Sequence, residues 1–405
     1  MNNKNLNLKN FIEKKHLNFQ NNKNLKKIFS KNIEKIIENI NTKKNVFFSF
    51  SNEFPYNFKT KNLKKFNKFK NIAIIGMGGS ILGSEAICCF LKKKVKKKLV
   101  FIDNIDGEKI KMFDKKNVVN QTLFIVISKS GNTVETLSNL LALKIIKKNA
   151  KNLIIISEKK ENILFSLSNK MNLYHVEHKD YIGGRYSVLS EVGMLPAYLM
   201  GLNIKKFRRN LLTHFKLKNK NFLKESSTIF TSLLLQKKFK NLIFLNYSPK
   251  LNKFLSWYQQ LIAESLGKKN NGFLPVISTA PKDHHSLLQL YMDGPKDKLF
   301  YIFSEIKKKD KVVKTLNLDP NIKFLNNKNL SEIKLAQKNA LIQALKKGNI
   351  PFREIKIKKF NEETLGQLFS YFILETVLIG IMANINPFDQ PAVEQVKINT
   401  KSFLK

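Results

Sequence analysis

The chain has 405 residues, 43 % of them hydrophobic, and it carries a formal net charge of +43. This length is enough for two or three domains with buried cores, and the hydrophobic content excludes a mainly disordered chain. Such a charge alone would favour a nucleic acid or an anionic membrane as partner. The lysines are spread along the whole sequence among Asn, Ile and Phe, so we interpret them as a compositional bias carried on solvated surfaces.

Residues 1–68 are predicted to form a helical N-terminal arm of one or two short helices. Ile33, Ile36, Ile37 and Ile40 recur at the spacing that places side chains on one face of a helix. A Lys-rich approach to the main body follows them. We expect this segment to be a cap or an arm.

From Asn71 onward, apolar runs alternate with helical stretches, which is typical of a parallel sheet covered by helices on both faces. The expected strands are 71–75, 98–103, 122–128, 152–157 and 172–177. Helices are expected from Ser80, from Thr133 and after Arg185, the last running to about Met200. These elements form a predicted first α/β domain, 69–204.

A second alternating region follows a looser stretch around Lys205 to Lys224, where we place the domain boundary. Its expected strands are 242–247, 274–278, 298–304 and 352–357, and its expected helices are 250–266, one from about 283, and 331–346. The predicted fold class is therefore α/β, with two sandwich domains built on parallel sheets. They are 69–204 and 205–360, followed by a C-terminal helical segment, 361–405, and the two halves are candidates for structurally related domains.

The apolar stretch from Leu365 to Ile385 is about as long as a membrane-spanning helix. It contains the polar residues Gln367, Glu375 and Asn384, which are rare inside membrane spans. We therefore predict a buried helix of a globular protein and no membrane partner.

The two cysteines favour a reducing compartment. Cys88 and Cys89 are adjacent in an apolar stretch and cannot build a disulfide framework. Residues 1–45 also lack the continuous apolar run of a secretory signal. A cytoplasmic location is expected.

Two strands end in turns suited to a phosphate group. The first turn is rich in glycine and ends at Ser80, whereas the second carries Ser128, Lys129, Ser130 and Thr133 at the start of a helix. Hydroxyls and an ammonium beside unpaired helix N-terminal amides form an anion-binding cradle. The ligand predicted from this pattern is a phosphorylated small molecule.

Two common nucleotide motifs fit these turns less well. The first turn reads Gly76-x-Gly78-Gly79-x-x-x-Gly83, which lacks the sixth-position glycine of the dinucleotide fingerprint. Asp103 lies near the spacing expected for a ribose-binding acid and keeps that alternative open. A Gly-x-x-x-x-Gly-Lys-Ser/Thr run is absent from the sequence, which argues against a nucleotide-hydrolysing P-loop.

Glu264 is a candidate general base. It is the only acid on the amphipathic helix 250–266, just before a glycine turn, and a carboxylate in a cleft can abstract a proton. The alternative is an ordinary surface glutamate. His284 and His285 start the next helix and, as neighbours, point in different directions, so they suit one acid/base and one scaffold rather than a metal site.

Arg185 follows two glycines in a chain that otherwise prefers lysine. Its planar guanidinium is either a catalytic donor or a structural clamp. His175 and His178 lack the spacing of a zinc site, so no metal is expected. Spacing alone does not select Lys397.

With these motifs in order, the chain resembles the phosphoglucose isomerase (glucose-6-phosphate isomerase) family, whose two sugar-isomerase (SIS) sandwiches enclose the active site. The matching segments are Ile75-Gly-Met-Gly-Gly-Ser80, Ser128-Lys-Ser-Gly-Asn-Thr-Val-Glu-Thr136, Gly183-Gly-Arg-Tyr-Ser187, Gln260 with Glu264-Ser-Leu-Gly-Lys268 and His285-Ser-Leu-Leu-Gln289, and Phe388-Asp-Gln-Pro-Ala-Val-Glu-Gln-Val-Lys397. The first two segments indicate only a SIS domain, whereas all five in order are more specific.

The resemblance implies reversible isomerisation of glucose 6-phosphate and fructose 6-phosphate in glycolysis and gluconeogenesis, without cofactor or metal. It assigns the sugar phosphate to Ser128, Lys129, Ser130 and Thr133, and the sugar pocket to Gly79, Ser80, Gln260 and Gln390.

The resemblance also implies catalytic roles. His285 would assist ring opening, helped by Lys397 and oriented by Glu135. Glu264 would move a proton between C2 and C1 through a cis-enediolate, whose charge Arg185 would stabilise. The histidine would come from the partner subunit, which implies a homodimer with the active site at the interface.

Two other functions stay open at this point. One is a SIS-type phosphosugar isomerase that also accepts mannose 6-phosphate. The other is a non-catalytic phosphosugar sensor that binds DNA, although residues 1–68 show no convincing helix-turn-helix and we expect no specific nucleic-acid partner.

Overall fold

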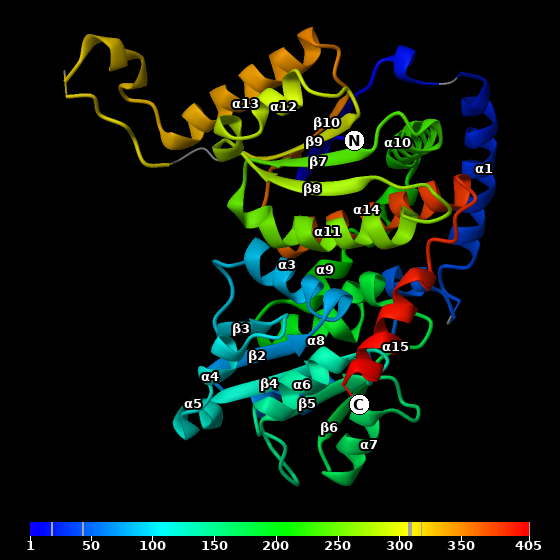
Figure 1. Cartoon of the computed structure of the whole chain (residues 1–405), viewed down its shortest axis with the longest axis vertical. Coiled ribbons are helices and arrows are strands. Elements are labelled where there is room, and N and C mark those ends of the chain that lie inside the picture. Colours follow the sequence, from blue (N-terminus) through cyan, green and yellow to red (C-terminus); the bar gives the residue numbers. More distant parts are fainter. Residues whose placement is uncertain (18, 43, 307–309, 317, 405) are drawn as a thin grey trace.

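The computed structural model describes residues 1–17, 19–42, 44–306, 310–316 and 318–404. Its core holds two five-stranded sheets, near opposite ends of the long axis in Figure 1. Helices α3 (Leu82–Phe90) and α11 (Asn252–Leu266) pack against each other between the sheets. This contact joins the two halves of the molecule.

The first sheet has the strand order β3-β2-β4-β5-β6, and all its pairs are parallel. The strands are β2 (Asn71–Gly76), β3 (Lys98–Ile102), β4 (Thr122–Ile127), β5 (Leu153–Ser157) and β6 (Tyr174–Glu177). Every residue of β4 is buried, because a central parallel strand is covered on both faces. The expected strands and the parallel sheet are confirmed.

Helices and short turns cover this sheet. They are α4 (Gly107–Lys111), α5 (Lys116–Gln121), α6 (Val134–Ala142), α7 (Ile163–Lys170) and α8 (Glu191–Leu199). Helices α3 and α8 each follow a 3-10 turn, η4 (Gly78–Ser80) and η5 (Gly184–Leu189). These two turns lie against each other and carry site residues.

The second sheet has the order β1-β10-β9-β7-β8. Its strands are β7 (Asn241–Asn246), β8 (Leu274–Thr279), β9 (Lys298–Glu305) and β10 (Phe352–Ile357), all parallel, with β1 (Leu6–Phe11) antiparallel at the edge. Strands β7 to β10 connect in the same order as β2 to β5, so these four strands of each sheet share one topology. Helices α12 (Leu288–Met292) and α13 (Leu330–Lys347) follow strands of this sheet. A 3-10 turn, η8 (Lys282–His285), lies where the sequence predicts a helix from about residue 283.

The N-terminal arm differs from its prediction as a purely helical segment. β1 is a strand, and α1 (Phe19–Glu38) is one long helix rather than one or two short ones, with α2 (Thr60–Leu63) after it. Leu6 and Leu8 are fully buried, and the polar Asn7 between them fits the period-two pattern of a strand, but the pattern spans only a few residues of a Lys- and Asn-rich stretch. The arm therefore completes the second sheet.

The looser stretch expected at 205–224 is also helical in the structure. It contains α9 (Ile204–Arg208) and the start of α10 (Leu217–Gln236). The buried face of α10 carries hydroxyl residues, and Thr228 and Thr231 donate to carbonyls four residues earlier. Because these hydroxyls are satisfied within the helix, a polar sequence packs in the interior.

The long apolar helix is α14 (Glu362–Met382), which by length and composition could cross a membrane. Its most apolar window is 94 % buried inside the protein, where it packs against α9, α10 and α11. Glu375 in its middle is buried and pairs with the buried Arg353 at 2.7 Å. The prediction of a buried helix is confirmed. The exposed helix α15 (Glu394–Phe403) follows it.

Candidate active site

Arg185 is the centre of a polar cluster assembled from distant parts of the sequence. It lies in η5, directly after the Gly183–Gly184 pair, and is 2 % exposed. Its nitrogens donate five hydrogen bonds: from Nε to Ser265 Oγ (2.9 Å), from Nη1 to Glu264 Oε2 (3.1 Å) and Gln390 Oε1 (2.6 Å), and from Nη2 to the carbonyls of Pro387 (2.5 Å) and Asp389 (3.0 Å). One planar donor thus joins η5, α11 and the segment 387–390.

Glycines allow the first turn to approach this cluster. A Cβ on Gly79 would lie 2.2 Å from the carbonyl carbon of Gly184, so the backbones of η4 and η5 are in direct contact. Gly78 has a φ of +51°, and a Cβ there would lie 2.7 Å from Gln260 Nε2. Only glycine fits at both positions. Gly79 therefore lies beside Gly184 and Arg185, Gly78 lies beside Gln260, and Ser80 ends the same turn.

Glu264 is held by two donors at the end of α11. Its Oε1 accepts from Gln260 Nε2 at 2.8 Å, and its Oε2 accepts from Arg185 Nη1 at 3.1 Å. The side chain is 32 % exposed, whereas that of Arg185 is 1 % exposed. The carboxylate is therefore fixed in direction but still open to solvent, unlike a freely mobile surface glutamate.

A pocket of about 680 Å³ opens next to this carboxylate. It is lined by the end of α11, the turn after it and the segment 385–393, and includes Glu264 and Gln390. This volume lies within the range of about 300–1,000 Å³ that is usual for small-molecule sites. A sugar-sized ligand fits there.

Lys268 and Asp389 also belong to this cluster, although no role was predicted for either residue. Lys268 Nζ donates to Asp389 Oδ1 at 2.8 Å, to the Asp389 carbonyl at 2.6 Å and to the carbonyl of Asn386. Hydrogen bonding from Lys268 lowers the pKa of Asp389. The pair ties the end of α11 to the segment that carries Gln390. Both residues lie inside motifs that the chain shares with the family it resembles, and this position is the sequence signal that could have identified them.

The residues predicted to form a phosphate cradle follow β4. Ser128 is buried, and its Oγ lies 2.8 Å from Thr133 Oγ1. Thr133 is the N-cap of α6 but makes no side-chain cap, and the exposed Ser130 accepts from Asn132 N at 3.3 Å. Amides at this helix start are thus open to an anion.

Lys129 already has acceptors beside this cradle. Its Nζ donates to the Asp180 carbonyl at 2.5 Å and lies 3.7 Å from Glu158 Oε1. Burial lowers the pKa of Lys129, partly offset by Glu158. The ammonium is held at the edge of the loop.

The structure does not bring every predicted residue to the Arg185 cluster. His285 is exposed, and Lys397 is 58 % exposed on α15, where it pairs with Glu394 at 3.1 Å. Among the residues that the structure describes, His285, Lys397 and Glu135 make no hydrogen bond or ion pair with Arg185 or Glu264. Glu135 lies in the first turn of α6.

The two adjacent histidines point in different directions, as expected. His284 is half-buried, and its Nε2 lies 2.7 Å from the hydroxyl of Tyr247, whereas His285 faces solvent. Burial lowers the pKa of His284, and the neighbouring His285 lowers it further. Asp283 fixes the turn by accepting from Thr279 N at 2.7 Å. His284 is thus the anchored member of the pair.

His175 and His178 are anchored in the first half of the molecule. His175 Nε2 lies 3.0 Å from Ser157 Oγ, and His178 Nδ1 lies 3.0 Å from the Lys179 carbonyl. Burial lowers the pKa of both rings to about 4. Within the described ranges of the chain, no group of three or more His, Cys, Asp or Glu is placed to hold a metal ion.

Solved structures share this fold. A crystal structure of a hypothetical protein from Thermus thermophilus aligns over 98 % of this chain and 100 % of its own length, with a TM-score of 0.80 and 22 % identity. A glucose-6-phosphate isomerase from Chlamydia trachomatis aligns over 85 % of this chain and 72 % of its own, with a TM-score of 0.70 and 20 % identity. These likenesses confirm the predicted fold class.

Sequence comparison adds the family. The profile of phosphoglucose isomerase matches residues 8–281. A glucose-6-phosphate isomerase of Methanocaldococcus jannaschii is 34 % identical over 84 % of this chain and 86 % of its own length, and one of Campylobacter jejuni is 32 % identical over 83 % and 85 %. The chain therefore belongs to the phosphoglucose isomerase family.

Proposed function

We propose that this chain is an aldose–ketose isomerase that interconverts glucose 6-phosphate and fructose 6-phosphate. The observation that carries the proposal is the contact between Arg185 Nη1 and Glu264 Oε2, 3.1 Å apart at the edge of a pocket of about 680 Å³. This chemistry needs a carboxylate base and a fixed cation where negative charge develops. The contact supplies both in one place.

Glu264 is the proposed base. It removes the proton from C2 of the open-chain aldose, the C2–H electrons form the C1–C2 double bond, and the carbonyl electrons move to O1. The resulting cis-enediolate passes its hydroxyl proton from O2 to O1 and takes the carboxyl proton back at C1, which gives the ketose. Because the proton only changes carbon, the reaction has no net oxidation and requires no redox cofactor.

Arg185 is the proposed electrostatic stabiliser of the enediolate. Ser265 and two backbone carbonyls fix Nε and Nη2, so Nη1 remains as the nitrogen shared by Glu264 and Gln390. A cation held in place by protein groups needs no reorganisation when charge develops. Gln260 holds Glu264 Oε1 and is assigned, together with Gly79 and Ser80, to positioning the sugar.

The phosphate of the substrate is assigned to Ser128, Lys129, Ser130 and Thr133. Support comes from the paired hydroxyls of Ser128 and Thr133 at the start of α6. Phosphate lies far from the reacting carbons in this assignment, so its binding energy orients the substrate.

His285, Lys397 and Glu135 are assigned to ring opening, with His285 supplied by the partner subunit of a homodimer. The exposure of His285 and of Lys397 in a single chain supports this assignment, because neither touches the Arg185 cluster of its own chain. Val396 is 67 % exposed and Phe403 is 90 % exposed on the same helix α15 as Lys397. Apolar side chains of this kind favour coverage by another surface.

The domain boundaries and the cytoplasmic location also stand as proposals. We divide the chain into 1–68, 69–204, 205–360 and 361–405, with the last segment completing the active site through Gln390. Strand β1 shows that the first segment also contributes to the second sheet. Two adjacent cysteines without a disulfide are compatible with the cytoplasm.

The test is conversion of fructose 6-phosphate to glucose 6-phosphate, coupled to a dehydrogenase, with a chelator present. Glu264→Gln should lower kcat by about 10²–10⁴-fold, the usual contribution of a general base. Glu225→Gln, an exposed residue of α10, is the matched control and should keep full activity. A folded wild type without activity would sink the proposal. Mannose 6-phosphate in the same panel tests the breadth of substrates.

A further inference from the structure

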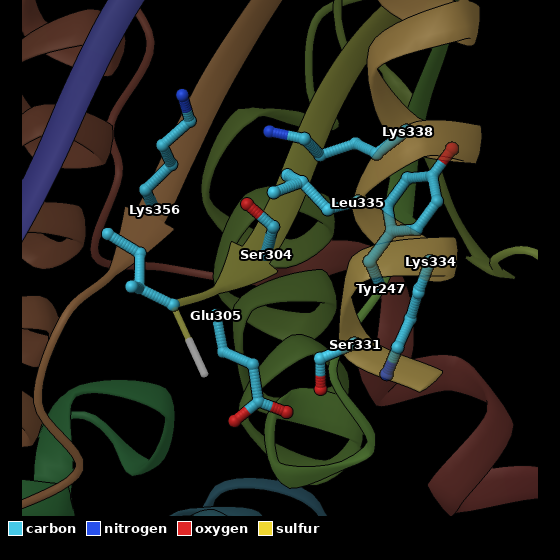
Figure 2. Close-up of a pocket in the computed structure, with 9 residues that line it drawn as sticks. Tyr247, Ser304, Glu305, Ser331, Lys334, Leu335, Lys338 and Lys356 are labelled. Atoms are coloured by element: carbon cyan, nitrogen blue, oxygen red, sulfur yellow. The ribbon is translucent and has the colours of Figure 1, made fainter. Parts of the chain in front are cut away.

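A second pocket lies at the carboxyl ends of strands in the second sheet. It has a volume of about 260 Å³ and shares no lining residue with the pocket beside Glu264. Figure 2 shows it between the ends of β9 and β10 and helix α13. The lining residues are Tyr247, Ser304, Glu305, Ile306, Ser331, Lys334, Leu335, Lys338 and Lys356.

The pocket has a surplus of positive charge. Three lysines and one glutamate line it, and the glutamate, Glu305, is paired with Lys250 at 2.5 Å. Lys338 and Lys356 share a single carboxylate, that of Glu354, at 2.5 Å and 3.2 Å. Among the described residues, Lys334 makes no ion pair.

The neighbours of the lining residues do not remove this surplus. Lys250 adds one positive charge, and Glu354 and Asp310 add two negative ones, the latter accepting from Ser331 Oγ at 2.5 Å. Among the residues that the structure describes around this pocket, four lysines thus stand against three carboxylates. The side chain of Lys338 is only 2 % exposed, and burial lowers its pKa. An ammonium that is out of water and shares its one counterion gains from a further anion.

The position of the pocket repeats a position in the first sheet. Ser128 follows the register pair Gly76–Ile127, and Ser304 follows the corresponding pair Asn246–Phe303. Ser128 thus comes directly after the last β4 residue that pairs with β2, and Ser304 comes directly after the last β9 residue that pairs with β7. Strands β4 and β9 hold corresponding places in the two sheets. A helix begins after each, α6 with N-cap Thr133 and α13 with N-cap Asn329.

Doubly wound parallel sheets bind their ligands outside the carboxyl ends of the strands. In the first sheet this place carries the proposed phosphate cradle, and that assignment rests on the proposed function. In the second sheet, Lys356 pairs with Ser304 in the register of β9 and β10. A lysine therefore stands at the register position beside the equivalent serine.

We propose that this pocket is a second anion site, which binds a phosphate group through Lys334, Lys338, Lys356 and the Ser304 hydroxyl. Its volume of about 260 Å³ is below the usual range of about 300–1,000 Å³ for sites of drug-sized ligands. It fits inorganic phosphate or the phosphate end of a small metabolite, rather than a second whole sugar phosphate.

The test measures binding of radiolabelled inorganic phosphate to the full chain by equilibrium dialysis at constant ionic strength. The double variant Lys334→Gln/Lys356→Gln leaves the buried Lys338 in place. The control Lys26→Gln/Lys347→Gln removes the same charge at exposed positions outside the pocket. We expect two saturable sites per chain in wild type and control, and one in the pocket variant, with isomerase activity within about twofold of wild type.

The outcomes separate the two proposals. Equal stoichiometry in the pocket variant, the control and the wild type would overturn the second site while leaving the isomerase intact. A Lys129→Gln variant that keeps both sites and full activity would count against the proposed phosphate cradle instead. Non-saturable uptake in all variants would mean general attraction to a basic surface and would also overturn the second site.

Chemical footprinting gives a readout that does not depend on stoichiometry. Acetylation of Lys334 and Lys356, followed by mass spectrometry, should slow severalfold in phosphate relative to chloride at equal ionic strength. Lys347, on the same helix α13 but outside the pocket, should react equally in both. Equal rates for all three lysines would contradict the proposal.

Discussion

Arg185 Nη1 donates to Glu264 Oε2 at 3.1 Å, although the two residues lie 79 positions apart in the sequence. The other nitrogens of the guanidinium are occupied by Ser265 and two backbone carbonyls. The same side chain therefore holds the segment 387–390 in place and faces the candidate base. The clamp and the catalytic donor considered from the sequence are compatible roles of one residue.

Replacing Arg185 with Lys should lower kcat more than it raises KM. A lysine keeps the charge but cannot form five directed bonds, so the enediolate loses its fixed cation and the segment 387–390 loses its anchor. We expect a drop in kcat of about 10²–10³-fold, the scale of one lost oxyanion donor. Steady-state kinetics and thermal melts check this, with the exposed Arg209→Lys as control. Wild-type kcat in Arg185→Lys would exclude the role.

Replacing Gln260 with Ala should slow proton transfer without abolishing it. Gln260 Nε2 donates to Glu264 Oε1 at 2.8 Å, so the variant frees one oxygen of the base. We expect kcat to fall about tenfold, the scale of 1.4 kcal/mol, and the acid limb of the kcat–pH profile to move. Gln259→Ala is the neighbouring control, because Gln259 bonds to the Pro275 carbonyl instead. An unchanged pH profile would mean that Gln260 acts only on packing.

Replacing Glu375 with Gln should destabilise the fold strongly. Both oxygens of Glu375 accept from the buried Arg353 at 2.7 Å, and the variant leaves that guanidinium without its counterion. Breaking a buried pair in this way costs about 3–5 kcal/mol. Urea denaturation measures the free energy of unfolding. Glu363→Gln on the same helix removes an exposed pair with Arg209 and should cost less than about 1 kcal/mol.

The free energy of unfolding should fall as the pH drops from about 6.5 to 4. Burial lowers the pKa of His175, His178 and His214 from 6.5 to about 4 in the folded chain. In this window the unfolded chain binds more protons, so stability is fully present above pH 6.5 and is lost on acidification. Each ring contributes a slope of up to about 1.4 kcal/mol per pH unit.

His214→Gln tests this dependence with a single ring. His214 is fully buried and contacts Ser370 Oγ at 3.1 Å, so the variant also loses stability at neutral pH. The diagnostic quantity is the slope of unfolding free energy against pH between about pH 6 and 5, which should decrease by up to about 1.4 kcal/mol per unit. A variant with the wild-type slope would show that His214 does not titrate in this range.

The parallel strands of both sheets follow from the sequence because their apolar runs are continuous and bounded. β4, Thr122–Ile127, is buried at all positions and is predicted within one residue. β1 and the start of α10 are missed, because their buried contacts depend on partners far along the chain. Leu6 pairs with Ile357, and Ser226 donates to Glu375 Oε1 at 2.6 Å. A local sequence pattern carries no information about such distant partners.

The residues of the candidate site also divide into those predicted from the sequence and those missed. Arg185, Glu264, Gln260 and Gln390 are predicted from motifs, and the structure brings them into one cluster. The tie between Lys268 and Asp389 is missed, because both residues lie inside family motifs but their mutual contact exists only once the fold brings the two motifs together. His285 and Lys397 remain predictions of role, because a single chain leaves both exposed.

The pairing of β1 with β10 determines the order in which the two sheets can be completed during synthesis of the chain. Residues 6–11 leave the ribosome long before their partner, residues 352–357, because the two segments stand far apart in the sequence. The first sheet uses only residues 71–177 and can close much earlier. Until β10 has been synthesised, Leu6 and Leu8 have no strand to join, so the nascent chain carries an unpaired apolar segment. Removing that segment would leave β10 as an open sheet edge, an arrangement that promotes aggregation.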